Sequence, residues 1–414
     1  MKALANNFIS VMSSPDPENI WTCSPGLCVS PVSGRIIATG GFRAQSSVSL
    51  PDGFKLGGRV FCSDDKGITW KCKHLFSFKH ARPFYVGNTL YIIGHDGDLM
   101  ICASYDDGET FTEASRLSEG QRWHQAPCNV LYGNGCVYLV MERLVYTDCK
   151  GWEPSVITPV LMRAETKSDL TKLDSWTFAS ELVFRDVFDD EELIRSGMAF
   201  FPIIPKSDYM AAPGRECGPP GWLETNIFRI YDDRHYFYDP EQRTIHLTGR
   251  SHLGWTNYAF LLKVIEDAPG QGRMTTAFQK LPSGGECRFI AMPGGHMKFH
   301  ILFDDQTKLY WLLSTQSTDS MTRAEFLSED RYNLPNNQRS RLVLHFSKNM
   351  IDWCFAGLVA VGGSEKQSRH YASMAIDGDD LLVLSRSGDE FAASAHNGNL
   401  ITFHKMNNFR ELVY

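Results

Sequence analysis

The chain has 414 residues, of which 43% are hydrophobic, 12% aromatic and 21% charged, so it can bury one large core or two ordinary ones. With 41 Lys and Arg against 48 Asp and Glu its formal net charge is -7, and the lack of any basic tail or block argues against a nucleic-acid partner. No apolar run approaches the ~18 residues of a membrane span, so we expect no membrane partner. The N-terminus MKALANNFIS lacks the apolar stretch of an export signal. We therefore expect a cytoplasmic location, or a secreted or periplasmic one if a leader has been removed.

Short apolar strands separated by Gly, Asp and Asn run along the chain, and few stretches have helical periodicity. One unit recurs, in which a strand, a tight turn and a second strand follow one another. Its six copies begin at Ser24, Ala81, His124, Thr225, Met297 and His370. After each hairpin come a third strand and an aromatic residue that we expect to begin a fourth, namely Trp70, Phe111, Trp176, Phe278, Trp353 and Phe409.

Four strands per unit and six units predict an all-β fold, a β-propeller of four-stranded blades, in which neighbouring blades cover each other's apolar faces. We expect a single propeller domain over residues 1–414, with insertions at about 184–222 and 316–339. A seventh blade within 184–222 and a pair of β-sandwiches are the alternatives. A strand near Phe8–Met12 is expected to close the ring beside the last blade.

Two of the turns between a third and a fourth strand share a sharper pattern. Residues 63–70 read SDDKGITW and residues 104–111 read SYDDGETF, which is S-x-D-x-G-x-T-aromatic in both. We expect the Ser and Asp side chains to bond turn amides, Gly to take a positive φ, and the aromatic ring to fill space between blades. This pattern resembles the Asp-box, or BNR repeat, of the sialidase superfamily. The resemblance implies a sialidase-like propeller, but Asp-boxes lie on the outer rim and say little about the reaction.

Propeller geometry predicts where functional side chains gather. The first strand of a blade and its hairpin partner are antiparallel, so the start of the first and the end of the second open on the same mouth. At the strand starts lie Cys23, Ser24, His124, Glu224, Asn226, His296, Lys298, Arg369, His370 and Tyr371. At the strand ends lie Arg43, His95, Glu142, Arg143, Arg250, His252, Arg386 and Asp389. Three tryptophans at the same mouth either stack on a sugar ring or pack between blades: Trp123, Trp222 and Trp255.

Several cations and histidines near one axis cost free energy unless a ligand, water or counter-charge compensates them. Arginine holds a carboxylate through two parallel hydrogen bonds, so the expected partner is an acidic sugar or oligosaccharide. The alternative is that the arginines form structural ion pairs, with Glu142 and Asp389 among the carboxylates, that hold blades together.

Two blades resemble sialidase blades in the residues that begin and end them. Glu224 opens the first strand of one blade in GWLETNIFRI, and Arg250 closes its second strand in RTIHLTGRSH. The resemblance implies that Glu224 polarises a tyrosine nucleophile and that Arg250 is one of three arginines that hold the substrate carboxylate. The blade HYASMAIDGDDLLVLSR is similar to the one that begins with the nucleophile, which places that role on Tyr371.

Other positions depart from the sialidase pattern. Cys23, in Cys-Ser-Pro, stands where sialidases have their first arginine, and the third arginine has only Lys298 or Arg288 near its place. The acid/base aspartate of the family has only Asp52 as a counterpart, so we expect the proton donor to be Asp52 or His124.

Three functions follow as hypotheses. The first is an exo-acting, sialidase-like glycoside hydrolase for an acidic sugar at the end of a short glycan, with Tyr371 and Glu224 in the reaction. The second is a lyase of uronate-containing glycans, because the chain is also similar to propeller polysaccharide lyases and rhamnosyl-glucuronate enzymes; His124 and Tyr371 would then be base and acid. The third is a propeller that binds glycan without turnover. Three other histidines are expected at the same mouth, His252 as a catalytic residue and His95 and His370 as substrate-binding residues.

No cofactor or metal is expected. His296 and His300 form an H-x-x-x-H spacing without the glutamate of H-E-x-x-H, and a strand would hold their rings about 13 Å apart. No Walker or dinucleotide-binding glycine motif joins a strand to a helix. No oligomeric state is predicted.

Overall fold

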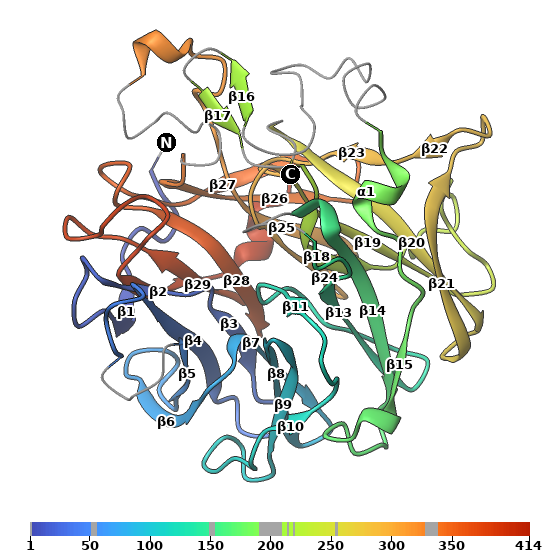
Figure 1. The fold of residues 1–414 in the computed structure, drawn as a ribbon, viewed down its shortest axis with the longest axis horizontal. Helices are drawn as coiled ribbons and strands as arrows, with labels where there is room; N and C mark the ends of the chain where they lie inside the picture. Colours follow the sequence, from blue (N-terminus) through green and yellow to red (C-terminus); the bar gives the residue numbers. More distant parts are fainter. Residues whose placement is uncertain are drawn as a thin grey trace.

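The structure is a computed structural model that describes residues 2–50, 56–148, 154–189, 209–212, 215–217, 220–252, 256–327 and 338–414. Its strands form six antiparallel blades around a central axis (Figure 1). The all-β propeller predicted from the hairpin repeat is therefore confirmed, with six blades rather than seven.

The first three blades use strands that are consecutive in the sequence. The first blade contains β2 (Ile20–Thr22) and β3 (Gly26–Val29), both paired with β4 (Ile36–Ala44), and then β5 (Leu56–Ser63) and β6 (Lys71–Phe76). The second contains β7 (Lys79–Val86), β8 (Thr89–Asp96), β9 (Asp98–Ser104) and β10 (Ser115–Arg116). The third contains β11 (Trp123–His124) and β12 (Leu131–Gly133), both paired with β13 (Cys136–Leu144), and then β14 (Ile157–Glu165) and β15 (Trp176–Phe178).

The other three blades complete the ring. The fourth contains β18 (Trp222–Phe228), β19 (Thr244–Ser251), β20 (Tyr258–Ala268), β21 (Gln271–Lys280) and β22 (Glu286–Cys287), with β23 (Phe289–Ala291) paired to β20. The fifth contains β24 (His300–Asp304), β25 (Leu309–Thr315), β26 (Arg341–Ser347) and β27 (Cys354–Val361). The sixth contains β28 (Arg369–Asp377), β29 (Asp380–Ser387), β30 (Leu400–Met406) and β1 (Ile9–Ser13).

The N-terminal strand closes the ring, as predicted. β1 pairs antiparallel with β30, with Ile9 opposite Phe403. Because the N-terminus supplies the fourth strand of the last blade, Phe409 does not begin a strand, contrary to expectation. It lies instead in a 3-10 helix, η5 (Phe409–Leu412), and its ring packs against Trp311 at 4.8 Å between centroids.

The described parts of the two predicted insertions contain short elements. The first begins with α1 (Phe184–Val187) and includes a two-stranded hairpin of β16 (Tyr209–Ala212) and β17 (Arg215–Cys217). The second joins β25 to β26 and contains η3 (Ala324–Phe326). The other described helices are η1 (Pro154–Val156) and η2 (Leu173–Ser175). Among the residues described, no helix is both long and apolar enough to cross a membrane.

The two S-x-D-x-G-x-T turns have the hydrogen bonds expected of their residues. Asp65 accepts bonds from the Thr69 hydroxyl at 2.6 Å and from the Thr69 amide at 2.8 Å, and Gly67 takes a φ of 90°. Residues 104–111 repeat the same bonds at the same distances. The threonine hydroxyl bond is the main reason that the pKa of Asp65 and of Asp106 is lowered to about 2.

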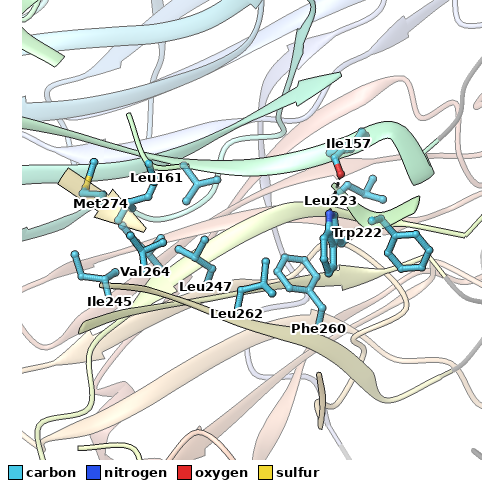
Figure 2. Close-up of a cluster of buried hydrophobic side chains, with 14 of the residues drawn as sticks. Ile157, Leu161, Trp222, Leu223, Ile245, Leu247, Phe260, Leu262, Val264 and Met274 are labelled. Carbon is cyan, nitrogen blue, oxygen red and sulfur yellow. Dashed lines mark hydrogen bonds between the residues drawn. The ribbon is translucent and has the colours of Figure 1, made fainter. Parts of the chain in front are cut away.

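Apolar side chains fill the spaces between neighbouring blades, as Figure 2 shows for the third and fourth. Trp222, at the start of β18, is 1% exposed, and its indole Nε1 donates to the Ile157 carbonyl at 2.8 Å. Phe184 and Phe260 enclose its ring, with centroids at 5.3 and 5.4 Å. Of the two roles expected for Trp222, packing between blades is therefore the one observed.

Candidate functional site

The innermost strands of alternate blades are distorted near one end. β7, β18 and β28 each contain a register shift in their pairing. Within these bulges His80, Glu224 and Tyr371 take φ values of 53°, 61° and 49°. Residues with a Cβ rarely adopt this left-handed region, and bulges beside functional sites re-aim side chains. Here the three distorted positions all face one cavity.

This cavity has a volume of about 600 Å³, within the range of small-molecule sites. The predicted residues that it brings together are Cys23, Ser24, Arg43, His95, Trp123, His124, Glu224, Arg250, Tyr371 and Arg386. They come from the first, second, third, fourth and sixth blades, as expected of a shared mouth. Lining residues that the sequence reasoning did not select include Lys79, His80, Arg122 and His396.

The cavity is positively charged, although the chain as a whole carries a formal charge of -7. Among the described residues, its lining contains one carboxylate, that of Glu224, against five Lys and Arg side chains: Arg43, Lys79, Arg122, Arg250 and Arg386. Burial lowers the pKa of Arg386 to about 10, which leaves it charged at neutral pH. A cavity with this imbalance favours an anion.

Three guanidinium groups surround the phenol of Tyr371. Arg250 Nη1 donates to Tyr371 Oη at 3.4 Å. The Cζ atoms of Arg339 and Arg386 lie 5.5 and 5.7 Å from the Tyr371 ring centroid, which is within cation–π range. The Nε atoms of Arg339 and Arg386 are buried and have no hydrogen-bond partner among the described residues. These groups can therefore donate to a ligand placed beside the phenol.

Glu224 adjoins the same nitrogen of Arg250 as Tyr371 does. Its Oε2 atom is 3.7 Å from Arg250 Nη1 and has no hydrogen-bond partner within the described part of the chain. The residue is only 2% exposed. A buried carboxylate oxygen that lacks a donor is costly, so it is well placed to accept a proton or a ligand hydroxyl.

His124 and Glu142 form a hydrogen-bonded pair at the cavity wall. Glu142 is fully buried, and its Oε1 accepts bonds from the amide and hydroxyl of Thr225 at 3.0 and 2.9 Å. Its Oε2 lies 2.8 Å from His124 Nδ1. Because a carboxylate accepts, Nδ1 carries the proton, and in the neutral ring Nε2 is the basic atom. This is the arrangement of a base held by an orienting carboxylate.

Two more histidines adjoin this pair. The rings of His80 and His95 stack at 5.5 Å between centroids with an interplanar angle of 12°. They lie 5.8 and 5.9 Å from the ring of His124. Burial, reinforced by the neighbouring imidazoles, holds the pKa of His80 and of His95 well below the ordinary value. Both rings are therefore neutral at pH 7.

Two predicted arginines make structural contacts away from the cavity. Arg143 donates to the Glu181 carboxylate. Arg369 donates to the carbonyls of Ser368 and Gly388 at 2.7 and 2.8 Å. For these two, the alternative expectation of a structural role describes the geometry, because neighbouring oxygens already take up their donors.

Lys298 and His370 lie behind the cavity wall rather than in it. Lys298 is 1% exposed, and its Nζ donates to the Ala372 carbonyl at 2.5 Å, directly after Tyr371. His370 Nδ1 lies 3.0 Å from Arg339 Nη1. Both residues therefore support parts of the site instead of facing a ligand.

The remaining predicted positions lie elsewhere. His252 is not among the residues that line the cavity. Arg288, one of two places considered for a third arginine, pairs with Glu286 at 2.9 Å. Trp255 and Asp52 fall outside the described residues.

Arg339 and His396 were missed for one reason. The end of a second strand and the start of the third open on the same mouth, but the sequence reasoning used only first-strand starts and second-strand ends. Arg339 lies two residues before β26, and His396 lies between β29 and β30, so both belong to connections that this rule also places at the mouth. His80 was missed because the bulge in β7 begins just before the expected hairpin.

Within the described residues, no cluster of three or more His, Cys, Asp and Glu side chains has a geometry suited to a metal ion.

No known family model matches the chain, and no curated protein sequence does. Solved structures do. Hadza microbial sialidase Hz136 is 12% identical, with 97% of this chain and 68% of that chain covered and a TM-score of 0.55. This chain has the fold of sialidase-like six-bladed propellers. Trypanosoma rangeli sialidase in complex with sialic acid is also 12% identical, over 100% of this chain and 61% of that one, with a TM-score of 0.55.

A Penicillium chrysogenum α-L-arabinanase complexed with arabinobiose has the same architecture, at 12% identity and a TM-score of 0.51 over 99% of both chains. The sialidase-like propeller described here spans only 61% of the Trypanosoma sialidase. The comparisons therefore show the fold alone, and the function has to be argued from the residues of this chain.

Proposed function

We propose that this chain is a sialidase-like glycoside hydrolase that acts on a carboxylate-bearing sugar at the end of a short glycan. The observation that carries the proposal is the convergence of Arg250, Arg339 and Arg386 on Tyr371. Arg250, Arg386 and Tyr371 line the cavity, and Glu224 is the one carboxylate among the described residues that line it. Guanidinium groups from three blades fit a planar carboxylate and would fix the sugar ring against the phenol.

In the proposed reaction the phenol oxygen of Tyr371 attacks the anomeric carbon and the bond to the leaving oxygen breaks. Glu224 is the group that takes the phenol proton, because its Oε2 and Tyr371 Oη both adjoin Arg250 Nη1, at 3.7 and 3.4 Å. His124 would protonate the leaving oxygen, since Glu142 holds its Nδ1 and leaves Nε2 for the proton transfer. In the second step His124 activates water, which releases the sugar from Tyr371.

A lyase for uronate-containing glycans is the second candidate, and the geometry of His124 favours it. A neutral His124 with its basic Nε2 can remove the proton next to the uronate carboxylate, and Tyr371 can protonate the leaving oxygen. The neutral His80 and His95 beside His124 suit this chemistry too, because they add no charge that repels a protonated base.

The test is a panel of sialyl, glucuronyl, rhamnosyl-glucuronate and unsaturated uronate oligosaccharides, followed by reducing-end release and ultraviolet absorbance. The proposal predicts new reducing ends without a rise in absorbance, whereas elimination would create an absorbing conjugated double bond. Tyr371→Phe should lower the rate by roughly 1000-fold or more, and the exposed Tyr236→Phe, 84% accessible in the wild type, should leave it unchanged. Binding of the panel without turnover would reject both enzyme candidates in favour of a glycan-binding propeller.

A further inference from the structure

A second cavity, of about 510 Å³, lies further along the innermost strands. Its lining includes residues of β3, β24, the later part of β7 and the later part of β28. Lys79 and His80 at the start of β7, Tyr371 near the start of β28 and Ser24 just before β3 line the candidate site instead. Because a strand advances about 3.3 Å per residue, the two cavities occupy opposite ends of the propeller axis. The apolar part of the lining includes Leu27, Val29, Phe84, Val130, Leu302 and Ile376.

Arg82 is the one Lys or Arg among the described residues that line this cavity, whose lining also includes the polar side chains of Asn129, His300 and Ser373. Arg82 lines the cavity and is only 2% exposed. All three of its guanidinium nitrogens, Nε, Nη1 and Nη2, are buried without a hydrogen-bond partner among the described residues. A guanidinium carries five N–H donors, and leaving them unpaired in a buried place costs free energy. The Arg82 guanidinium can therefore donate hydrogen bonds to an acceptor that the described residues do not supply.

Neighbouring charges do not neutralise Arg82 by direct contact. Burial lowers its pKa to about 10, and the groups that oppose this are Cys128 and Glu142. The Glu142 carboxylate already accepts bonds from Thr225 and His124. The second cation nearby, Lys298, donates to the Ala372 carbonyl. The end of the cavity near Arg82 therefore has an excess of positive charge.

We propose that this cavity binds a small carboxylic acid with an apolar body, its carboxylate held by Arg82. A planar carboxylate matches the guanidinium fork, and the apolar walls would cover the body of the ligand. The site is separate from the arginine-lined cavity around Tyr371 and does not depend on the function proposed for it.

The probe is 3-phenylpropionate, titrated into the full chain by calorimetry. We expect saturable binding, with the uncharged amide analogue and Arg82→Met each weakening affinity at least about tenfold. Arg82→Met should fold with an unchanged or higher melting temperature, because it replaces an unpaired buried charge by an apolar side chain of similar length.

Two further variants test whether 3-phenylpropionate binds in the cavity of Arg82 and not in the candidate site. Ala375→Phe leaves Arg82 in place but fills the cavity, which Ala375 lines, and it should abolish binding. Arg386→Met alters only the candidate site and should leave binding of 3-phenylpropionate unchanged. The proposal is overturned if Arg82→Met and Ala375→Phe bind 3-phenylpropionate as the wild type does, or if Arg386→Met removes the binding. It is also overturned if no heat of binding is found, or if chloride at the same concentration displaces bound 3-phenylpropionate.

Discussion

At the scale of single residues, neighbours in the sequence differ sharply in what they contact. Arg369, His370 and Tyr371 are consecutive, but only Tyr371 lines the candidate cavity. Arg369 bonds backbone carbonyls, and His370 contacts Arg339. The sequence could place all three near the mouth. It could not separate them, because the bulge in β28 breaks the alternation from which side-chain direction is predicted.

The pair of His124 and Glu142 gives a prediction at this scale. Glu142→Gln keeps the size of the side chain but replaces one oxygen by an amide donor, so it no longer holds His124 Nδ1–H as a carboxylate does. We expect kcat on the acidic substrate to fall by roughly 10- to 100-fold, with a changed pH profile and little change in melting temperature. Glu181→Gln, which disturbs only the pair with Arg143, is the matched control. A wild-type pH profile in Glu142→Gln would contradict the role assigned to the pair.

At the scale of elements, the distorted inner strands position the site. His80, Glu224 and Tyr371 occupy left-handed backbone conformations in the second, fourth and sixth blades, which cost of order 1–3 kcal/mol each in residues with a Cβ. The hairpins themselves were predictable, because Gly, Asp and Asn mark the turns between apolar strands. The bulges were not, since they are kept by tertiary contacts such as the one from Lys298 to the Ala372 carbonyl.

Backbone strain at Glu224 can be measured with two variants that both lack the carboxylate. Glu224→Gly tolerates a φ of 61°, whereas Glu224→Ala retains a Cβ and its steric cost. We expect the glycine variant to have the higher free energy of unfolding, by about 1 kcal/mol, in urea denaturation. Because both variants lose the same charge, equal stabilities would show that the bulge at Glu224 is unstrained.

The contact of Lys298 behind Tyr371 leads to a second prediction about this strand. Lys298→Met removes the buried ammonium that donates to the Ala372 carbonyl, so the bulge that presents Tyr371 should relax. We expect kcat to fall at least about tenfold with little change in KM, while the melting temperature stays the same or rises. The exposed Lys308→Met, with a side chain 70% accessible in the wild type, serves as control. An unchanged kcat in Lys298→Met would contradict the positioning role.

At the scale of the whole molecule, the ring joins residues that are far apart in sequence. β1 completes the blade of β28, β29 and β30, and the three arginines around Tyr371 come from the fourth, fifth and sixth blades. The repeat made this architecture predictable, because each blade repeats the same local pattern. The contribution of Arg339 was not predictable, because Arg339 is the last residue of the insertion 316–339, where the sequence pattern of the blade is interrupted.

Buried histidines throughout the ring should make the protein sensitive to mild acid. Burial lowers the pKa of His246 and of His404 to about 4, and that of His296 to about 3, from an ordinary value of 6.5. Between these values the unfolded chain binds more protons than the folded chain, so the free energy of unfolding decreases as the pH falls below about 6.5. Urea denaturation at pH 7.5 and pH 5 should show a loss of a few kcal/mol at the lower pH.

The carboxylates provide an internal control for this pH effect. Asp65 and Asp106, with a pKa lowered to about 2, contribute stability above their ordinary value of 3.8 and lose it only as the pH falls toward 2. A loss between pH 6.5 and pH 5 therefore belongs to the histidines. Equal stability at pH 7.5 and pH 5 would mean that the histidine rings are not buried as described.

The measurement that tests the central claim most directly compares a carboxylate-bearing glycoside with its methyl ester. Once the substrate panel has identified the preferred sugar, kcat/KM is determined for the acid and for the ester with the wild-type protein. Because Arg250, Arg339 and Arg386 converge on Tyr371, the acid should be turned over roughly 100-fold faster or more. Equal rates for acid and ester would contradict the claim that these arginines recognise the carboxylate of a sugar.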